Sequence, residues 1–249
     1  MAAALLVLAA LAGWEALVRA GAVDELLLPA PTDVAQALWT DRSILADDLA
    51  VTVGEVLLGL AAALALGAAL GLAMHLWAPV RRTLRPLVIG SQAVPIPVIA
   101  PLFILVLGFG LAPKVLMVAL VCFFPVTINL YDGLRDVDQD AQKLLRSLDA
   151  TRWRRLTLLE APSALPATFT GIKVAAAVAV IGAVFAEWAG SDRGLGHTLL
   201  IANGQLETAR AFAATVLLFV LAIALYGLFA LLERRVVDWT PRTAPRGGS

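Results

Sequence analysis

Five long stretches without a charged side chain constrain this chain more than any other feature of its sequence. They cover residues 56–74, 86–113, 115–131, 174–186 and 211–232. A helix needs about 20 mostly apolar residues to cross the hydrocarbon core of a bilayer. The strands of a membrane barrel would alternate polar and apolar residues over about 10 positions, and the sequence has no such alternation. The pattern therefore predicts an all-α integral membrane protein.

Composition excludes several classes of function. Of the 249 residues 60% are hydrophobic and 15% charged, whereas about a quarter of a soluble domain is charged. The net charge is zero, so no nucleic-acid partner is expected. Cys122 is the single cysteine, which excludes a disulfide or a cysteine metal site within one chain. The only histidines, His75 and His197, are expected on opposite sides of the membrane, which argues against a membrane enzyme.

Six spans are expected, at about residues 2–20, 51–76, 86–108, 113–133, 166–188 and 209–233, within a single transmembrane domain. The first segment also fits a signal peptide with a cleavage site near residues 20–22. No Lys or Arg precedes that segment, which is unlike a signal peptide but also fits an incomplete amino terminus. The tail 240–249 is expected to be disordered.

The distribution of basic residues predicts the orientation. With six spans, thirteen Lys and Arg residues lie on the side of the loop 134–165 and five on the other side. Basic residues concentrate in cytoplasmic loops. The loop 134–165 and both termini are therefore expected in the cytoplasm, with lipid around the spans. If the first segment were a cleaved signal peptide, the loop would still face inward.

Several smaller features carry local expectations. Thr32 or Asp33 is expected to cap a short helix that runs to about Trp39. Gly67 and Gly71 form a small-xxx-small pair, which lets another helix approach closely. Lys173 lies about 10 Å into the fifth span, and its simplest role is to extend back to the cytoplasm.

The third span has an unusual start. Pro95, Pro97 and Pro101 fall early in an uncharged stretch that also contains Gln92. Proline removes a backbone donor and kinks helices, and irregular backbone persists in a membrane only where protein or a watery cavity covers it. The segment is therefore either pore-lining or a kinked packing helix. The candidate translocation path comprises Gln92, Pro95, Pro97, Asn129 and Glu187.

The loop 134–165 carries the densest charge in the chain. Its six basic residues alternate with apolar residues at helical spacing, among them Leu144, Leu148 and Trp153. This pattern predicts two short amphipathic helices joined at Asp149–Ala150, with apolar side chains that need a partner.

The same loop resembles the cytoplasmic signature of binding-protein-dependent ABC import permeases, in which a Glu-Ala-Ala triplet precedes a glycine and a later Ile-x-Leu-Pro. Lys143-Leu144-Leu145 occupies the triplet position, Asp149 the glycine position, and Leu159-Glu160-Ala161-Pro162 the end. The spacing agrees, although several residues differ. The resemblance extends to residues 27–31, 92–95, 100–102, 131–135, 186–188 and 194–196, and is greatest to the nitrate, sulfonate, taurine and thiamine-precursor branch.

This resemblance implies a permease of the bacterial inner membrane that works with a cytoplasmic ABC ATPase and an extracytoplasmic substrate-binding protein. A homodimer of permeases is the default expectation. The sequence contains no G-x-x-x-x-G-K-[ST] phosphate loop, so no cofactor is expected on this chain, and ATP and Mg are expected on the partner. The chain is accordingly not expected to be an enzyme. The residues expected to couple to the ATPase are Lys143, Leu144, Leu145, Ser147, Leu148, Asp149, Ala150, Thr151, Arg152 and Trp153.

Departures from the signature give a test. A glycine between two helices usually adopts a left-handed conformation. Asp149 can adopt it at a cost of roughly 1 kcal/mol. The sequence therefore predicts a positive φ at Asp149, or a remodelled turn. Lys143 in place of an acidic residue alters a possible charge contact with the ATPase.

The solute is expected to be a thiamine pyrimidine precursor or a similar heterocycle, with an aliphatic sulfonate, taurine or nitrate as the alternative. A sulfonate would favour a cation near the path, and Lys173 is the only candidate. A stand-alone secondary transporter would predict inverted repeats or paired charges within the membrane, and would leave the loop 134–165 without a purpose.

Overall fold

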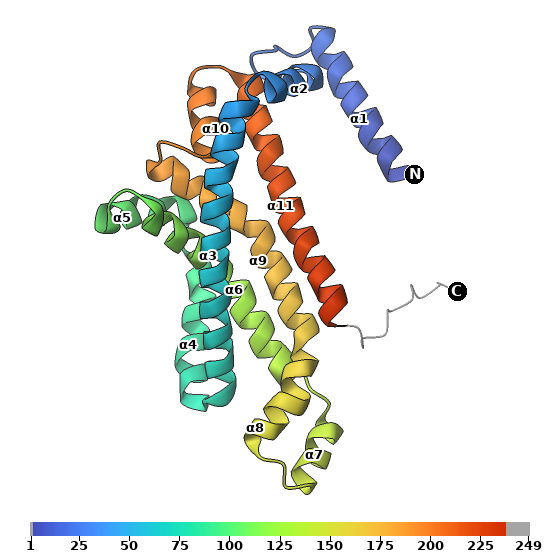
Figure 1. The fold of residues 1–249 in the computed structure, drawn as a ribbon, viewed down its shortest axis with the longest axis vertical. Helices are drawn as coiled ribbons and strands as arrows, with labels where there is room; N and C mark the ends of the chain where they lie inside the picture. The colour runs from blue at the N-terminus through green and yellow to red at the C-terminus, as the bar shows by residue number, and fades with distance from the viewer. Residues whose placement is uncertain (1, 238–249) are drawn as a thin grey trace.

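The computed structural model describes residues 2–237, and this part of the chain is helical and contains no β-strand. Figure 1 shows a bundle of long helices with two short helices projecting from one end. The elements are α1 (Ala2–Arg19), α2 (Pro31–Thr40), α3 (Arg42–Leu76), α4 (Ala78–Gly90), a 3₁₀ turn (Ser91–Ala93), α5 (Ile96–Leu107), α6 (Leu111–Arg135), α7 (Gln139–Ser147), α8 (Arg152–Arg155), a π-helical turn (Leu156–Glu160), α9 (Ala161–Gly190), α10 (Leu195–Gly204) and α11 (Thr208–Val236). The predicted tail 240–249 lies outside the described residues.

Four helical segments are long and apolar enough to cross a membrane. They are α3, α6, the continuous stretch Arg152–Gly190 that includes α9, and α11. The expected spans 51–76, 113–133, 166–188 and 209–233 fall within these segments. The helix α3 starts at Arg42, well before the expected residue 51. The expected first span coincides with α1. The structure does not describe the side chains of residues 2–4.

The expected third span, 86–108, is not one helix. Its two halves, Ala78–Ala93 and Ile96–Leu107, are bent by 103° at the intervening break. Pro95 has an extended backbone and precedes α5, and Pro97 lies in the first turn of α5. Proline is tolerated in a first turn, where its missing N–H is not needed, so the proline cluster ends one helix and starts another. The pair is either a broken span or a re-entrant loop.

Small residues bring α3, α6 and α9 together. A Cβ on Gly67 would lie 2.8 Å from Val126 Cβ, and one on Gly71 would lie 3.0 Å from the carbonyl oxygen of Thr127. Gly59 is tighter still, because its Cβ would lie 2.4 Å from Val118 Cβ. The expectation that Gly67 and Gly71 admit a neighbouring helix is confirmed, and that helix is α6.

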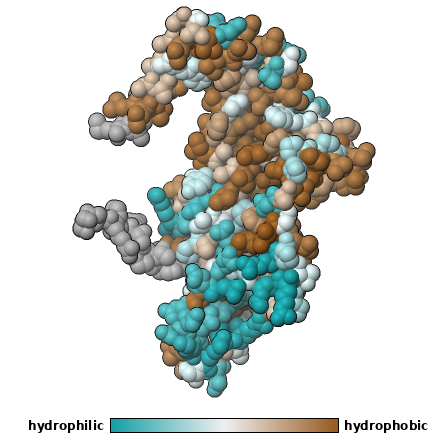
Figure 2. All heavy atoms as spheres, turned by 180° about the vertical axis from the view of Figure 1, so that it is seen from behind, coloured by the Kyte–Doolittle hydropathy of each residue, from teal (hydrophilic) through white to brown (hydrophobic). Residues whose placement is uncertain are grey.

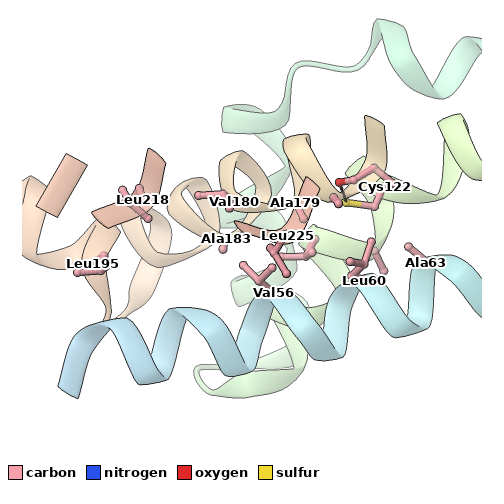
Figure 3. Close-up of a cluster of buried hydrophobic side chains, with 14 of the residues drawn as sticks. Val56, Leu60, Ala63, Cys122, Ala179, Val180, Ala183, Leu195, Leu218 and Leu225 are labelled. Carbon is pink, nitrogen blue, oxygen red and sulfur yellow. Dashed lines mark hydrogen bonds between the residues drawn. The ribbon is translucent and has the colours of Figure 1, made fainter. Parts of the chain in front are cut away.

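The buried core joins α3, α6, α9 and α11. Figure 3 shows Val56 and Leu60 of α3 facing Ala179 and Ala183 of α9, with side chains of α11 beside them. Alanine and valine dominate this core, which suits close packing between helices in lipid. The hydrophilic surface in Figure 2 gathers at the end that carries α7 and α8, and hydrophobic surface covers most of the rest of the visible face.

The start of α2 differs from the prediction. The residue that caps α2 is Ala30, and Pro31 opens the helix. Asp33 lies within the first turn, where its Oδ2 accepts a hydrogen bond of 3.2 Å from the backbone N–H of Ala30. The expected cap at Thr32 or Asp33 is therefore wrong, because Pro31 already has the backbone angle that a first helical residue needs.

Candidate functional site

Two short helices form a hairpin at the polar end of the bundle, as the sequence predicts. The first, α7, is capped by Asp138, whose carboxylate accepts hydrogen bonds from the backbone of Asp140 at 2.7 Å and of Ala141 at 3.2 Å. These hydrogen bonds hold the pKa of the Asp138 carboxyl below its ordinary value. Thr151 caps α8 by accepting from the backbone N–H of Arg154. Both caps fix where the hairpin helices begin.

The turn between them has the predicted backbone conformation. Asp149 has a φ of +54°, which confirms the expectation from the glycine position of the signature. The N–H of Ala150 donates to Leu145 O at 3.0 Å, and the N–H of Asp149 donates to Arg146 O at 3.1 Å. This pair of bonds is the Schellman ending of a helix, which places a left-handed residue just after the last turn.

The hairpin exposes large apolar side chains. Leu144 is 61% exposed, Leu148 69% and Trp153 66%, and none of the α7 or α8 residues is buried. Residues of this kind at the end of a permease-like bundle need another surface to cover them. The structure brings them together on one projecting element (Figure 1).

The remaining hairpin residues make local contacts. Lys143 forms an exposed ion pair of 2.8 Å with Asp140, and the Ser147 hydroxyl donates to Leu144 O at 2.8 Å. Leu145 and Ala150 are half-buried. Arg152 differs, because its guanidinium donates to the carbonyl oxygen of Leu76 at the end of α3.

The root of the hairpin contains residues that the sequence did not single out as functional. Glu160 pairs with His75 at 2.8 Å between Oε2 and Nε2. Leu156 is buried in a small cluster with Leu134 of α6 and Ala164 of α9, against which Leu72 and Leu76 of α3 pack. Glu160 is the only charged residue in the otherwise uncharged stretch 156–166, and the sequence could have singled it out for that reason. Its partner could not be found in this way, because His75 lies 85 residues away.

The candidate path residues fall into two groups. Gln92 and Pro95 line a cavity of about 230 Å³ at the break before α5, together with Ser91, Ile96, Ile99 and Leu120. Pro97 is exposed in the next turn. Asn129 lies within the bundle, where its side-chain amide donates to Pro125 O at 2.8 Å. The structure thus places Asn129 and Glu187 apart from this cavity, and their part in the path stays a prediction.

Glu187 belongs to a polar network at the end of the bundle opposite the hairpin, called the outer network and defined as Asp48, Thr52, Glu187 and the start of α10. It is 1% exposed. Its carboxylate lies 2.7 Å from the Thr52 hydroxyl and accepts from the backbone N–H groups of Gly196 at 2.6 Å and His197 at 3.1 Å. Asp48 accepts from the backbone N–H of Gly194 at 3.0 Å and from the Thr198 hydroxyl. Carboxylates at a helix N-terminus satisfy its free N–H groups, so this network fastens α10 to α3 and α9.

Both lysines within the membrane-spanning part are paired with glutamates. Lys114 Nζ lies 2.7 Å from Glu55 Oε1 and also donates to Ser191 Oγ at 2.6 Å. Lys173 Nζ lies 2.6 Å from Glu233 Oε2 of α11. Glu233 lies in the last turn of α11 and supplies a partner for Lys173, and the expectation that Lys173 extends back toward the cytoplasm stays a prediction.

The comparisons with known proteins agree on one family. Residues 56–238 match the family described as "Binding-protein-dependent transport system inner membrane component". A "Probable ABC transporter permease protein" of Haemophilus influenzae is 35% identical over 86% of this chain and 87% of that protein. The "Formylaminopyrimidine transport permease protein ThiX" of Halalkalibacterium halodurans is 33% identical over 86% of each chain.

The relatives differ in the solutes their names give. The "Riboflavin transport system permease protein RibX" of Chloroflexus aurantiacus is 39% identical over 64% of this chain and 59% of that protein. Permeases named for aliphatic sulfonates and for taurine are 31% and 29% identical.

A solved structure has the same fold. The membrane subunit of the MetNI methionine ABC transporter, in an inward-facing conformation, aligns with a TM-score of 0.68 over 79% of this chain and 98% of that chain, at 15% identity.

Proposed function

We propose, from the membership of this chain in the binding-protein-dependent transport system inner-membrane family, that it is the ABC importer permease for a small neutral heterocycle of the thiamine pyrimidine-precursor type. The chain is a multi-pass membrane component of an ABC importer and a transport subunit rather than an enzyme. Energy enters the chain through the hairpin, and the lining of the path determines which solute can pass.

The exposed apolar hairpin carries the coupling part of the proposal. Leu144, Leu148 and Trp153 are large apolar side chains that lie exposed on a pair of capped helices. Such side chains suit the groove of a cytoplasmic ATPase subunit, in which aromatic and large apolar side chains supply most of the binding free energy. ATP and Mg bind to that subunit, and closure of two such subunits moves two hairpins together. The long helices then tilt and open the path to the outside.

The pairing of the membrane lysines favours a neutral solute. An anionic sulfonate would require a cation along the path, because a charge in a low-dielectric interior needs a partner. Lys173 and Lys114 are each neutralised by a glutamate at 2.7 Å or less. The cavity beside α5 has Gln92 and Ser91 as its hydrogen-bonding side chains and is otherwise apolar. An uncharged ring with amide-like groups fits that lining better than an anion does.

The remaining partners are inferred from the same family membership. An extracytoplasmic substrate-binding protein delivers the solute to the side opposite the hairpin. A second copy of this chain completes the path, since two hairpins are needed for two ATPase subunits. Both termini lie in the cytoplasm of a bacterial cell.

The test is uptake into proteoliposomes that contain this permease with the ATPase and binding protein encoded beside it. ATP-dependent accumulation of formylaminopyrimidine, with no accumulation of taurine, is the expected result. Accumulation of taurine instead would overturn the proposed solute and favour the sulfonate alternative. Uptake by the permease without any ATPase would overturn the coupling mechanism and leave a secondary transporter.

A further inference from the structure

The hairpin is attached to the bundle by side-chain contacts as well as by its continuous chain. His75, in the last turn of α3, and Glu160, at the end of the π-helical turn, lie 2.8 Å apart, and the side chain of each is only 15% exposed. They are 85 residues apart in sequence. The contact therefore joins two elements that would otherwise be free to separate.

Two further contacts join the same pair of elements. Arg152 donates to the carbonyl oxygen of Leu76, one of the carbonyl groups that a helix end leaves without an intrahelical partner. Leu156 belongs to a small buried cluster with Leu134 of α6 and Ala164 of α9, and Leu72 and Leu76 of α3 pack against this cluster. A contact between His75 and Glu160, a helix-end hydrogen bond and a shared apolar cluster thus all hold the segment 152–160 near the end of α3, while α7 and the tip of the hairpin remain exposed.

The helix on the other side of these contacts reaches across the molecule. At 35 residues α3 is about 52 Å long, and it contains no proline, whereas α6 contains Pro125 and α9 contains Pro166. Near its outer end Asp48 and Thr52 belong to the outer network that holds the start of α10. Figure 1 shows α3 running from the level of α10 down toward α4 and the hairpin.

We propose that His75 and Glu160 are positioning residues that lock the hairpin to α3, so that movement of the hairpin is transmitted along α3 to the outer network as well as along α9. The inference rests on the proposed function, because it concerns how an ATPase-driven hairpin moves the spans. Through α9 alone, the movement would pass Pro166 before reaching the core. Through α3 it enters an unbroken helix at once.

The test measures solute uptake and ATP hydrolysis together in the reconstituted transporter. His75→Ala and Glu160→Gln are each expected to lower the uptake per ATP hydrolysed by roughly fivefold or more, the lower end of typical coupling between sites. ATP hydrolysis itself continues, because the exposed apolar face that binds the ATPase is intact. The double variant His75→Glu with Glu160→His restores the pair with the roles exchanged and is expected to recover most of the ratio.

A matched control breaks a similar ion pair far from the hairpin. Asp41 pairs with Arg210 at 2.8 Å, and its side chain is 16% exposed. Asp41→Asn is expected to leave the uptake per ATP at the wild-type value. If His75→Ala does not assemble, Glu160→Gln, which keeps the side-chain size, gives the same comparison.

Two results would overturn the proposal, and a third would reject the proposed function on which it rests. The first is a wild-type ratio in both single variants. The second is an equal fall of uptake and hydrolysis without recovery in the double variant, which is what a purely structural role predicts. The third is wild-type protein that shows no ATP-dependent uptake, which would instead reject the proposed function on which this inference rests.

Discussion

The outer network buries two carboxylates among partners of its own chain, whereas the hairpin of α7 and α8 exposes apolar side chains. Asp48 and Glu187 are held by backbone N–H groups and hydroxyls of α10 and α3. Leu148 and Trp153 are two-thirds exposed. A buried carboxylate with its partners in the same chain stabilises that chain by itself, while an exposed apolar pair does not. The comparison teaches that the carboxylates of the outer network find their partners within one subunit, and it supports the proposal that the hairpin is covered by another protein.

The largest expected effect comes from adding charge to the exposed apolar side chains of the hairpin. Leu148→Glu with Trp153→Glu places two carboxylates where an apolar groove is expected, and each buried anchor of this type typically contributes about 2 kcal/mol or more. Binding of the ATPase should fall by at least roughly 100-fold, as measured by co-purification and titration in detergent. The folded bundle should keep its stability, because both side chains are exposed.

A control for this variant is Leu27→Glu. Leu27 is 75% exposed on the opposite side of the molecule, so the same change of chemistry should leave ATPase binding intact. Unchanged binding by the hairpin variant, or equal loss in both, would show that the exposed apolar face is not the docking surface.

The second largest effect is expected on stability, when the outer network loses the carboxylate of Glu187. Glu187→Ala leaves the N–H groups of Gly196 and His197 without acceptors in a buried position, at a cost of about 1–3 kcal/mol for each unsatisfied group. Thermal unfolding in detergent should therefore shift to lower temperature by several degrees, with ATPase binding retained. Glu187→Gln, which keeps one acceptor oxygen, should shift less. Equal stability of Glu187→Ala and wild type would mean that the network does not hold α10.

The smallest effect sharpens the comparison within the hairpin. Asp149→Gly removes the strain of a left-handed non-glycine residue, worth about 1 kcal/mol, and should slow amide exchange in α7 by about fivefold. Asp149→Val should accelerate it, since a β-branched residue tolerates a φ of +54° poorly. Exchange in α10, measured in the same experiment, should not change. The same exchange rate in the glycine variant and wild type would show that Asp149 is not strained.

The sequence was informative where a local rule decides the structure. Uncharged length predicts the spans, and signature spacing predicts the left-handed turn at Asp149. The three prolines predict irregular backbone near Pro95, but not a bend of 103°, because that angle depends on how α5 packs against α6 and α9. The helix α2 starts at Pro31 because proline has the backbone angle of a first helical residue, and this local rule could also have been applied to the sequence.

The contacts between distant segments were not predictable in this way. His75 and Glu160 are each ordinary at the end of a helix, and only the packing of α3 beside the hairpin makes them a pair. Lys173 and Glu233 form an ion pair for the same reason, because α9 packs against α11. One chain without aligned relatives carries no signal for such pairs, since neither partner is unusual in its own segment.

The π-helical turn at Leu156–Glu160 has a consequence for the direction in which the hairpin points. Such a turn accommodates one residue more than an α-helical turn, and each α-helical residue advances about 100° around the axis. Deleting one residue there would let α8 continue into α9 as a regular helix. The hairpin would then keep nearly its present direction, because the π-helical turn already absorbs the extra residue. A deletion of one residue within α9 would instead rotate the hairpin by about 100° and carry its apolar side chains away from any groove that the native orientation suits.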